Sequence, residues 1–234
     1  MDALAATKAR TKEQWGIFHR VLNETATLPV RHVVGNHDVW GWSLDSNAKP
    51  DTAYGKAWAL DELSLQSGHY SFDQAGWHFT VLDSIYPAEG GYTARLDEAQ
   101  LEWLAGDLGA TPRTTPVCIV SHIPILAVCA FLDGDNETSG NWQVPGAWMH
   151  IDARAIKDVI KQHGNVRLAL SGHVHLQDQV NYLGVKYLCN GAVSGGWWNG
   201  PYQEFTNAYV TVDLYDDGSS EHQVHTFGWQ AKTA

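Results

Sequence analysis

The stretch that decides the fold is Val166-Arg167-Leu168-Ala169-Leu170-Ser171-Gly172-His173-Val174-His175. Its first five residues are mostly apolar and have the length of a short buried strand, and Gly172 lets the backbone turn sharply where that strand ends. Residues two apart on extended backbone point the same way, so we expect His173 and His175 to present two imidazoles to one small volume. Neutral imidazole binds Zn, Fe, Mn or Ni, although paired loop histidines are also common as ordinary polar residues. The stretch predicts a strand end with a candidate metal site.

Two further apolar runs end in polar groups of the same kind. Residues 29–34 lead into Gly35-Asn36-His37-Asp38, and residues 116–120 lead into Ser121-His122-Ile123-Pro124. In open α/β sheets the loops beyond the carboxyl ends of the strands converge on one crevice, so side chains far apart in sequence can meet there. An amide oxygen with imidazoles and no thiolate favours Mn, Fe or Zn. The candidate site gathers five side chains: Asn36, His37, His122, His173 and His175.

Helical spacing of apolar residues predicts helices over residues 11–23, 51–65 and 97–108, and another that begins at Asp152. Asp97 and Asp152 are the expected N-caps of the last two. Residues 69–83 alternate around Gln74-Ala75-Gly76, which predicts a hairpin whose second arm is buried. The stretch 126–150 has no period, and such long irregular segments in a compact domain are usually functional loops.

The chain changes character after His175. Four short strands follow, at residues 179–182, 185–189, 208–214 and 221–227, joined by Gly or Asp-Gly turns. Strands that alternate with helices and then give way to consecutive strands indicate an α/β fold in which two sheets stack face to face with helices outside. We find no linker, so the sequence predicts one domain over residues 1–234.

Composition excludes several classes of protein. The formal net charge is −11, which argues against a broad basic surface for nucleic acid, while small anionic substrates remain possible if metal ions supply positive charge locally. Three cysteines without CxxC spacing indicate neither a disulfide framework nor a thiolate zinc site, and we expect Cys118 and Cys189 to be core residues. No run is apolar for long enough to span a membrane, and residues 1–8 do not resemble a signal peptide. The sequence gives neither the compartment nor the oligomeric state.

The motifs Gly35-Asn36-His37-Asp38, Ser121-His122 and Gly172-His173-Val174-His175 resemble the last three of the five signature motifs of the calcineurin-like metallophosphoesterases. Their order and their positions at strand ends both match, and the resemblance runs from Pro29 to about Phe227. It implies a four-layer α/β/β/α sandwich of the metallo-dependent phosphatase type, with a binuclear centre that hydrolyses phosphate esters. The segment Gly191-Ala192-Val193-Ser194-Gly195-Gly196-Trp197-Trp198 is similar to bacterial members described as cyclic-nucleotide or general phosphodiesterases.

Carried over residue by residue, the resemblance makes Asn36, His122 and His173 ligands of one metal ion and His175 a ligand of the other. His37 is then the group that stabilises or protonates the leaving oxygen. Nearby cations depress the pKa of a histidine, so His37 needs a carboxylate partner, and the sequence does not show whether the adjacent Asp38 reaches it.

The aromatic residues close to the motif glycines admit two interpretations. Trp40, Trp197 and Trp198 either form the walls of a pocket that stacks a base or cover the ends of the sandwich. We expect the acidic residues of the long irregular segment, Asp133, Asp135 and Glu137, to lie in a solvated loop rather than in a third metal site.

The sequence departs from the family pattern at its beginning. The first two motifs, an Asp-x-His and a Gly-Asp, are absent, and with them a bridging carboxylate, further ligands of the second metal ion and the usual partner of His37. Asp2 could be the tail of the Gly-Asp motif, but a chain terminus frays, so we do not expect it to contact metal. The sequence therefore predicts a domain that lacks the first strand and helix, with weak metal occupancy and little turnover, because three neutral ligands compensate a divalent cation poorly.

Three functions fit these features. The first is a binuclear metallophosphoesterase, most simply a phosphodiesterase for a small or nucleotide-like substrate such as a cyclic nucleotide. The second is a non-catalytic domain of the same fold that binds a ligand or partner. The third is a phosphomonoesterase, including a protein phosphatase. The absent motifs favour the second, and the intact histidines favour the enzymes.

Overall fold

The computed structural model describes residues 2–43 and 49–231. Its helices and strands are, in chain order, α1 (Lys8–Thr25), η1 (Asn36–Asp38), α2 (Lys56–Glu62), β1 (Tyr70–Gln74), β2 (Trp77–Leu82), β3 (Ile85–Ala88), β4 (Gly91–Ala94), α3 (Glu98–Ala110), β5 (Val117–Ser121), η3 (Cys129–Phe131), β6 (Glu137–Thr138), β7 (Asn141–Trp142), α4 (Ala153–Ile160), β8 (Val166–Ser171), β9 (Gln177–Tyr182), β10 (Val185–Asn190), β11 (Ala208–Leu214) and β12 (Ser220–Thr226).

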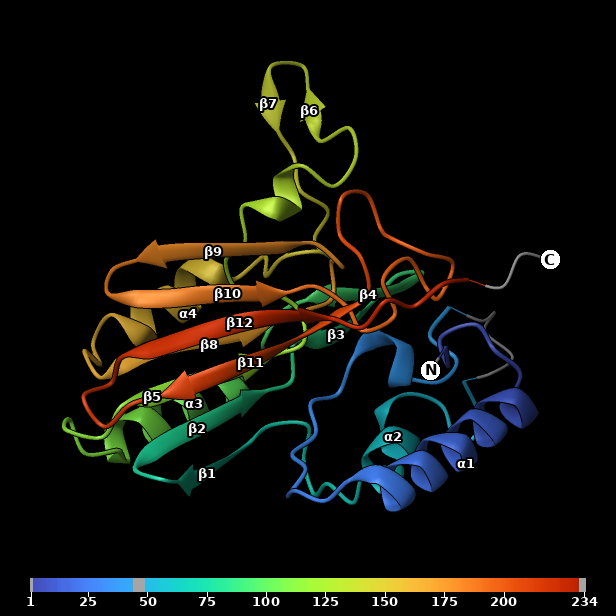
Figure 1. The fold of residues 1–234 in the computed structure, drawn as a ribbon, viewed down its shortest axis with the longest axis horizontal. Coiled ribbons are helices and arrows are strands. Elements are labelled where there is room, and N and C mark those ends of the chain that lie inside the picture. Colours follow the sequence, from blue (N-terminus) through green and yellow to red (C-terminus); the bar gives the residue numbers. More distant parts are fainter. Residues whose placement is uncertain (1, 44–48, 232–234) are drawn as a thin grey trace.

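A six-stranded sheet in the order β1-β2-β5-β8-β10-β9 forms the centre (Figure 1). The four inner strands are parallel, and the two edge strands, β1 and β9, run antiparallel to their neighbours. The stretch that decides the fold provides β8, which pairs with β5 on one side and β10 on the other. Because β2, β5, β8 and β10 are parallel, their carboxyl ends all lie at the same edge of the sheet.

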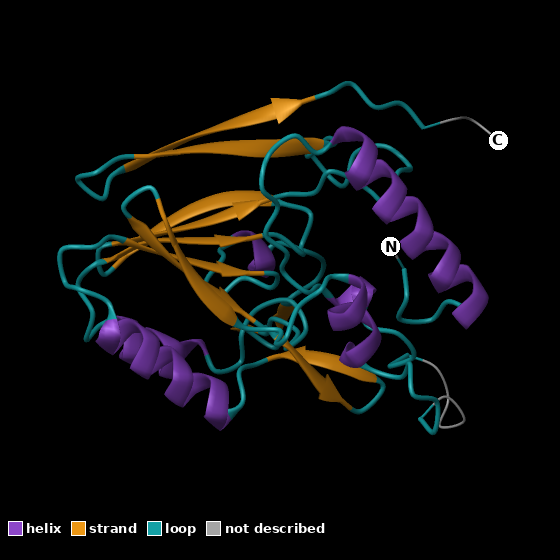
Figure 2. Ribbon diagram, turned by 90° about the horizontal axis from the view of Figure 1, so that it is seen from below, coloured by secondary structure: helices purple, strands orange, loops and turns teal. Residues whose placement is uncertain are grey.

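Different layers cover the two faces of this sheet (Figure 2). On one face, side chains of β5 such as Ile119 pack with Leu104 of α3 and Ile156 of α4. On the other face, Cys118 and Leu168 pack toward the β11–β12 hairpin. Successive side chains of these buried strands point to opposite faces of the sheet, so each strand packs against both layers. A mixed α/β fold was predicted from the sequence and is confirmed.

A separate apolar cluster lies beyond the carboxyl ends of the strands. Trp15 of α1 and Ala59 of α2 pack with Val34 and Val39, which flank the Gly35-Asn36-His37-Asp38 motif. Both helices occupy the lower right of Figure 1, close to the end of the sheet where the parallel strands stop. This cluster holds the first motif against the sheet.

Most predicted elements are present. The hairpin of β1 and β2 turns at Ala75 and Gly76, both with positive φ, as a tight two-residue turn demands. Asp97 caps α3 by accepting a hydrogen bond from the Gln100 amide. Asp152 precedes α4 as expected, but its carboxylate accepts hydrogen bonds from Leu96 N–H and the His150 ring instead of capping the helix.

Two predictions need correction. Residues 29–34 do not form a strand: they pair with no strand in the part of the chain that the structure describes, and the neighbouring Leu28 is 79% exposed. β propensity reflects packing against neighbouring strands, so an apolar run without such a neighbour remains irregular. The helix predicted over residues 51–65 shortens to α2, because Asp51 accepts the Ala53 N–H in a turn and Gly55 has a φ of 84°. None of the described helices is long and apolar enough to cross a membrane.

Candidate metal centre

The loop that follows β8 carries His173 and His175. Both residues adopt left-handed backbone, with φ of 75° and 61°, so the extended conformation expected from their spacing is wrong. Val174 and Leu176, which alternate with them, are buried in an apolar cluster under the loop. The buried pair anchors the loop, and the two imidazoles are left on the same side of it. The strain of two non-glycine residues with positive φ is a cost that packing must offset.

The end of β5 lies directly against this loop and against the first motif. The Gly172 N–H donates to the His122 carbonyl at 3.1 Å. A Cβ at Gly35 would lie 3.0 Å from Cε1 of His122, so the absence of a side chain at Gly35 is what lets that imidazole lie over the motif. Asp38 closes the motif on itself, because its Oδ2 accepts the Gly35 N–H at 2.8 Å.

One cavity of about 180 Å³ contains all five predicted side chains. Asn36, His37, His122, His173 and His175 line it. The five side chains therefore meet as predicted, although the first motif follows an irregular segment and only His122, His173 and His175 follow strands. Six further residues complete the lining: Tyr92, Asp133, Trp148, Val174, Trp197 and Tyr202.

Three of the predicted ligands contact one another. His122 Nε2 lies 2.8 Å from Asn36 Oδ1 and 3.1 Å from His173 Nδ1. The amide oxygen and the second imidazole nitrogen thus both lie close to His122 Nε2, and this donor set suits Mn, Fe or Zn. The three side chains therefore fit the ligand role that the motif resemblance assigns to them.

Outer contacts orient these ligands. The Asn36 amide nitrogen donates to the Tyr92 hydroxyl at 2.9 Å, which turns Oδ1 toward His122. His173 Nε2 lies 2.8 Å from the Ala147 carbonyl, and donation to that oxygen leaves Nδ1 as the nitrogen with a free lone pair. Such contacts fix the tautomer and ring direction of a metal-binding histidine.

The cluster is neutral near pH 7. Burial lowers the pKa of His122 well below its ordinary value, and the nearby His173, His37 and His175 lower it further. Burial also lowers the pKa of His173 to about 4 and shifts the pKa of His175 in the same direction. Neutral imidazole is the form that binds a metal ion, so these histidines need not lose a proton to bind one.

His175 occupies another part of the same cavity. Its Nδ1 lies 2.5 Å from the Gly195 carbonyl, so Nε2 remains for a ligand, and its ring centre is 4.6 Å from that of Trp197. Among the described residues, no group of three His, Cys, Asp or Glu ligand atoms within 4.8 Å of one another includes His175. His175 therefore takes no part in the contacts that join Asn36, His122 and His173.

His37 has a partner that the sequence did not reveal. Its Nδ1 lies 3.0 Å from Oδ1 of Asp2, and both side chains are partly exposed, with His37 alone lining the cavity. Asp38 does not reach the ring, because the Gly35 N–H holds its carboxylate, and burial raises the pKa of that group. Residues 2–4 run beside residues 37–43, with Ala3 N–H donating to the His37 carbonyl, so Asp2 is held in place rather than frayed.

The three tryptophans predicted near the site lie in different surroundings. Trp197 lines the cavity and is 52% exposed, which leaves its ring available for stacking. Trp40 does not line it: the ring is buried against Trp58 and donates to the Ala6 carbonyl. Trp198 does not line the cavity and packs on Trp229. Both Trp197 and Trp198 have positive φ.

Asp133 corrects the expectation of a solvated acidic loop. It is only 6% exposed, and its Oδ1 accepts hydrogen bonds from the Tyr202 hydroxyl and the Gln203 amide, each at 2.7 Å. It brings a carboxylate to the wall of the cavity. The lack of periodicity over residues 126–150 pointed to a functional loop, but no local signal distinguished Asp133 from the neighbouring acids.

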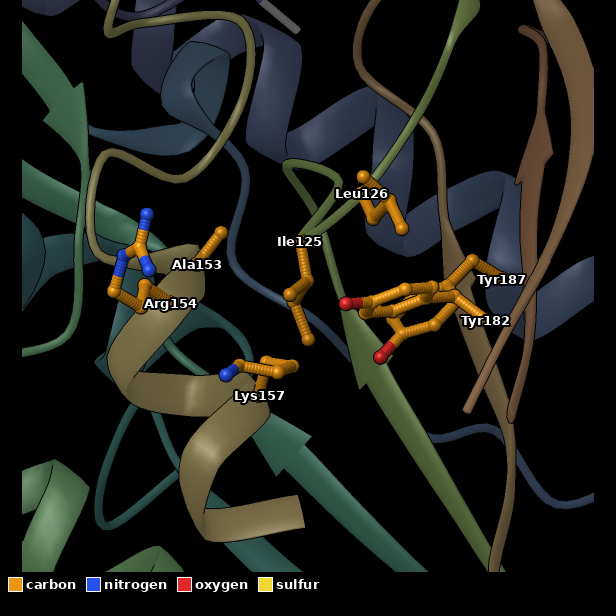
Figure 3. A pocket seen from close by; sticks show the side chains of 7 residues that line it. All are labelled: Ile125, Leu126, Ala153, Arg154, Lys157, Tyr182 and Tyr187. Atoms are coloured by element: carbon orange, nitrogen blue, oxygen red, sulfur yellow. The ribbon is translucent and has the colours of Figure 1, made fainter. Parts of the chain in front are cut away.

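A larger cavity of about 390 Å³ lies elsewhere, between α4 and the β9–β10 edge of the sheet (Figure 3). Tyr182 and Tyr187 form its strand wall, and Lys157 and Arg154 come from the helix. It contains none of the predicted ligands, so size alone does not mark the chemical site of this molecule.

The sequence matches the model of the calcineurin-like phosphoesterase family over residues 9–177. It is 23% identical over 172 residues to the 3′,5′-cyclic adenosine monophosphate phosphodiesterase CpdA of Escherichia coli, an alignment that covers 71% of this chain and 57% of that protein. A probable cyclic nucleotide phosphodiesterase of Synechococcus is 25% identical over 205 residues, covering 86% of this chain and 66% of the relative. The chain thus spans between half and two thirds of the length of these relatives.

A similar fold is found in a dimetal phosphatase from Danio rerio. The two structures share 16% sequence identity and superpose with a TM-score of 0.59, over 90% of this chain and 74% of the other. The structural likeness shows a common fold. With the family model covering most of the sequence, it leads to one conclusion: this chain belongs to the calcineurin-like phosphoesterases.

Proposed function

We propose that the protein is a metal-dependent hydrolase of phosphate esters, and that its substrate is a small or nucleotide-like phosphodiester. The observation that carries this proposal is the gathering of Asn36, His37, His122, His173 and His175 in one cavity. Two divalent cations, when bound, would supply positive charge to the phosphoryl oxygens and a hydroxide at neutral pH. Mn, Fe and Zn all suit the donor atoms, which do not select among them.

The protein's own groups have distinct roles in this proposal. Asn36, His122 and His173 hold one cation, with Tyr92 and Ala147 fixing the direction of the ligand atoms. His175 holds the other through Nε2. His37 lines the cavity and delivers a proton to the leaving oxygen, and Asp2 keeps its ring oriented.

The shape and lining of the cavity favour a diester over a bulky phosphoprotein. A volume of about 180 Å³ suits a small phosphate ester, so a bulky substituent has to lie at the rim. At that rim, Trp197 offers an exposed ring for stacking a base. The names of the Escherichia coli and Synechococcus relatives support cyclic nucleotides as the substrate class.

The charge of the ligand set supports a second candidate, a ligand-binding domain with little turnover. Asn36, His122, His173 and His175 are neutral, and Asp133 is the one carboxylate among the described residues that line the cavity. Its Oδ1 is already occupied by Tyr202 and Gln203. Neutral ligands compensate a divalent cation poorly, so we expect the chain to bind metal weakly.

Titration with Mn²⁺ and hydrolysis of a chromogenic phosphodiester at saturating Mn²⁺ test both candidates. Asn36→Ala and His122→Ala should each lower Mn²⁺ affinity by about tenfold or more and abolish any turnover, while the fold remains intact. His222→Ala, on the exposed face of β12, is the matched control and should change neither quantity.

Four outcomes decide the matter. Binding without turnover supports the ligand-binding domain, and metal-dependent turnover lost in both variants supports the enzyme. Unchanged metal binding in Asn36→Ala and His122→Ala contradicts the whole assignment of the site. Two equivalents of tightly bound metal with rapid turnover would instead show that the neutral ligand set is not a handicap.

A further inference from the structure

Two of the three cysteines meet an acidic residue outside the histidine cavity. Cys129 of η3, Asp178 of β9 and Cys189 of β10 bring one sulfur or carboxylate oxygen each within 4.8 Å of one another. Among the described residues this is the one group of three such ligand atoms at that spacing. The spacing of the cysteines in sequence gave no sign of a thiolate site, because the fold rather than a CxxC turn brings the sulfurs together.

The β9–β10 hairpin and η3 build this cluster. Asp178 and Cys189 are directly opposite in the antiparallel register, so their side chains lie on the same face of the hairpin. The Cys129 N–H donates to Asp178 Oδ2 at 2.7 Å and holds η3 over that face. Both cysteines are buried, so a metal ion held here would be shielded from solvent on most sides.

One oxygen atom of the cluster lacks the hydrogen-bond partner that a buried polar atom normally has. Asp178 Oδ1 is buried and has no hydrogen-bond partner, although its twin oxygen is satisfied. A buried carboxylate oxygen without a partner costs free energy, and native structures rarely leave one unexplained. A cation would satisfy this oxygen.

We propose that Cys129, Asp178 and Cys189 form a further metal site for a thiophilic divalent cation of the Zn²⁺ class. Two thiolates and a carboxylate are three of the four ligands of a tetrahedral zinc site, and water fills the fourth position. Binding converts two thiols to thiolates, so each metal ion taken up releases two protons while the carboxylate remains ionised.

The site lies under the loop that carries His173 and His175. Cys189 Sγ is 3.5 Å from the Gly172 carbonyl and 3.5 Å from the Leu176 carbonyl, the residues at the two ends of that loop. A metal ion bound here fastens η3 to β9 and β10 beneath the loop. Its role is structural and does not depend on the proposed hydrolase activity.

Cadmium titration of the reduced protein separates this site from the histidine cavity, because cadmium bound to thiolate absorbs strongly in the ultraviolet and cadmium bound to imidazole or amide does not. We expect one equivalent of this absorption per chain and two protons released with it. Cys129→Ser and Cys189→Ser should each remove the band. Cys118→Ser, which alters the remaining cysteine on β5, should keep it, as should the Asn36→Ala, His122→Ala double variant.

A second measurement uses the unaltered sequence, in case the serine variants do not fold. Zn²⁺ should protect Cys129 and Cys189 from alkylation in the native protein, as read by mass spectrometry of peptides. The proposal is overturned by an absent thiolate band at saturating cadmium, by a band that persists in both serine variants, or by a Cys129–Cys189 disulfide in protein isolated without reductant. If the protein shows the thiolate band but hydrolyses no phosphodiester, the proposed hydrolase function is refuted and the metal site stands.

Discussion

At the scale of single residues, Gly35 controls where His122 can lie. Gly35→Ala places a methyl group 3.0 Å from Cε1 of the imidazole, and that ring is held between Asn36 and His173. We expect the variant to lose about 1 kcal/mol or more of unfolding free energy and to bind Mn²⁺ more weakly, because the ring must shift. Urea denaturation and calorimetric titration measure the two effects.

Gly16→Ala is the matched control for this substitution. Gly16 lies within α1, and a Cβ there meets nothing within 4 Å. Alanine should stabilise the helix by up to about 1 kcal/mol and leave metal binding unchanged. Equal metal binding in Gly35→Ala and Gly16→Ala would mean that the close contact with His122 has no functional weight.

The candidate site was predictable from sequence only where motif and topology coincide. His122 and His173 were found because polar residues at the carboxyl ends of parallel strands share one edge, whereas Asn36 was found from its motif alone, since the residues before it form no strand. Tyr92 and Asp133 reach the cavity from a hairpin and an irregular segment, where no rule of spacing places a side chain. The contact between Asp2 and His37 was not predicted, because no strand precedes Asp2 whose end would place it at this edge of the sheet.

At the scale of elements, a histidine joins β1, β2 and α3. His78 Nδ1 lies 2.7 Å from Asp73 of β1, and its Nε2 lies 3.0 Å from Asp107 of α3. Burial alone would lower the pKa of His78, but the hydrogen bonds to Asp107 and Asp73 outweigh it and raise the pKa above 6.5. The protonated ring therefore binds both elements more tightly in the folded state than in the unfolded one.

The direction in which this stabilisation changes with pH gives a prediction for His78→Gln. Stabilisation by protonated His78 is complete below the unfolded pKa of 6.5 and is lost as pH rises through the higher folded value. The variant should therefore be destabilised by about 1 kcal/mol in mildly acidic buffer and by less in alkaline buffer. Urea unfolding of both proteins across this range measures the difference, with His222→Gln as an exposed control; a gap that grows with pH would contradict the assignment.

Helices and strands were predicted correctly where their apolar side chains pack against another element of the chain. The β1–β2 hairpin, α3 and β8 all pack into the central sheet or onto it, and all three occur where the period predicts them. Residues 29–34 have the same apolar character as β8 but form no ladder among the described residues. An apolar run therefore forms a strand only if another strand lies close enough to pair with that run.

At the scale of the whole molecule, the two-stranded sheet of β11 and β12 leaves apolar side chains exposed. Within the described residues β11 and β12 pair only with each other, and Val224 of β12 is 40% exposed. Strand edges with exposed apolar side chains favour pairing between molecules. We expect Val224→Lys to reduce self-association at high protein concentration, measured by light scattering, while changing the unfolding free energy by less than about 0.5 kcal/mol.

Thr114→Lys adds the same charge in an exposed turn far from this hairpin along the chain. If both lysine variants reduce self-association equally, net charge and not the β12 surface is responsible. A difference between them locates the association on β12.

The order of strands in the central sheet also bears on how the protein is made. β2, β5, β8 and β10 are added in the sequence in which a ribosome would deliver them. A nascent chain that has exposed only Asn36 and His122 offers a cation two of its neutral donors, and the third arrives with the loop after β8. Under the proposed function, the three donors are therefore complete only after the ribosome has passed the loop that follows β8.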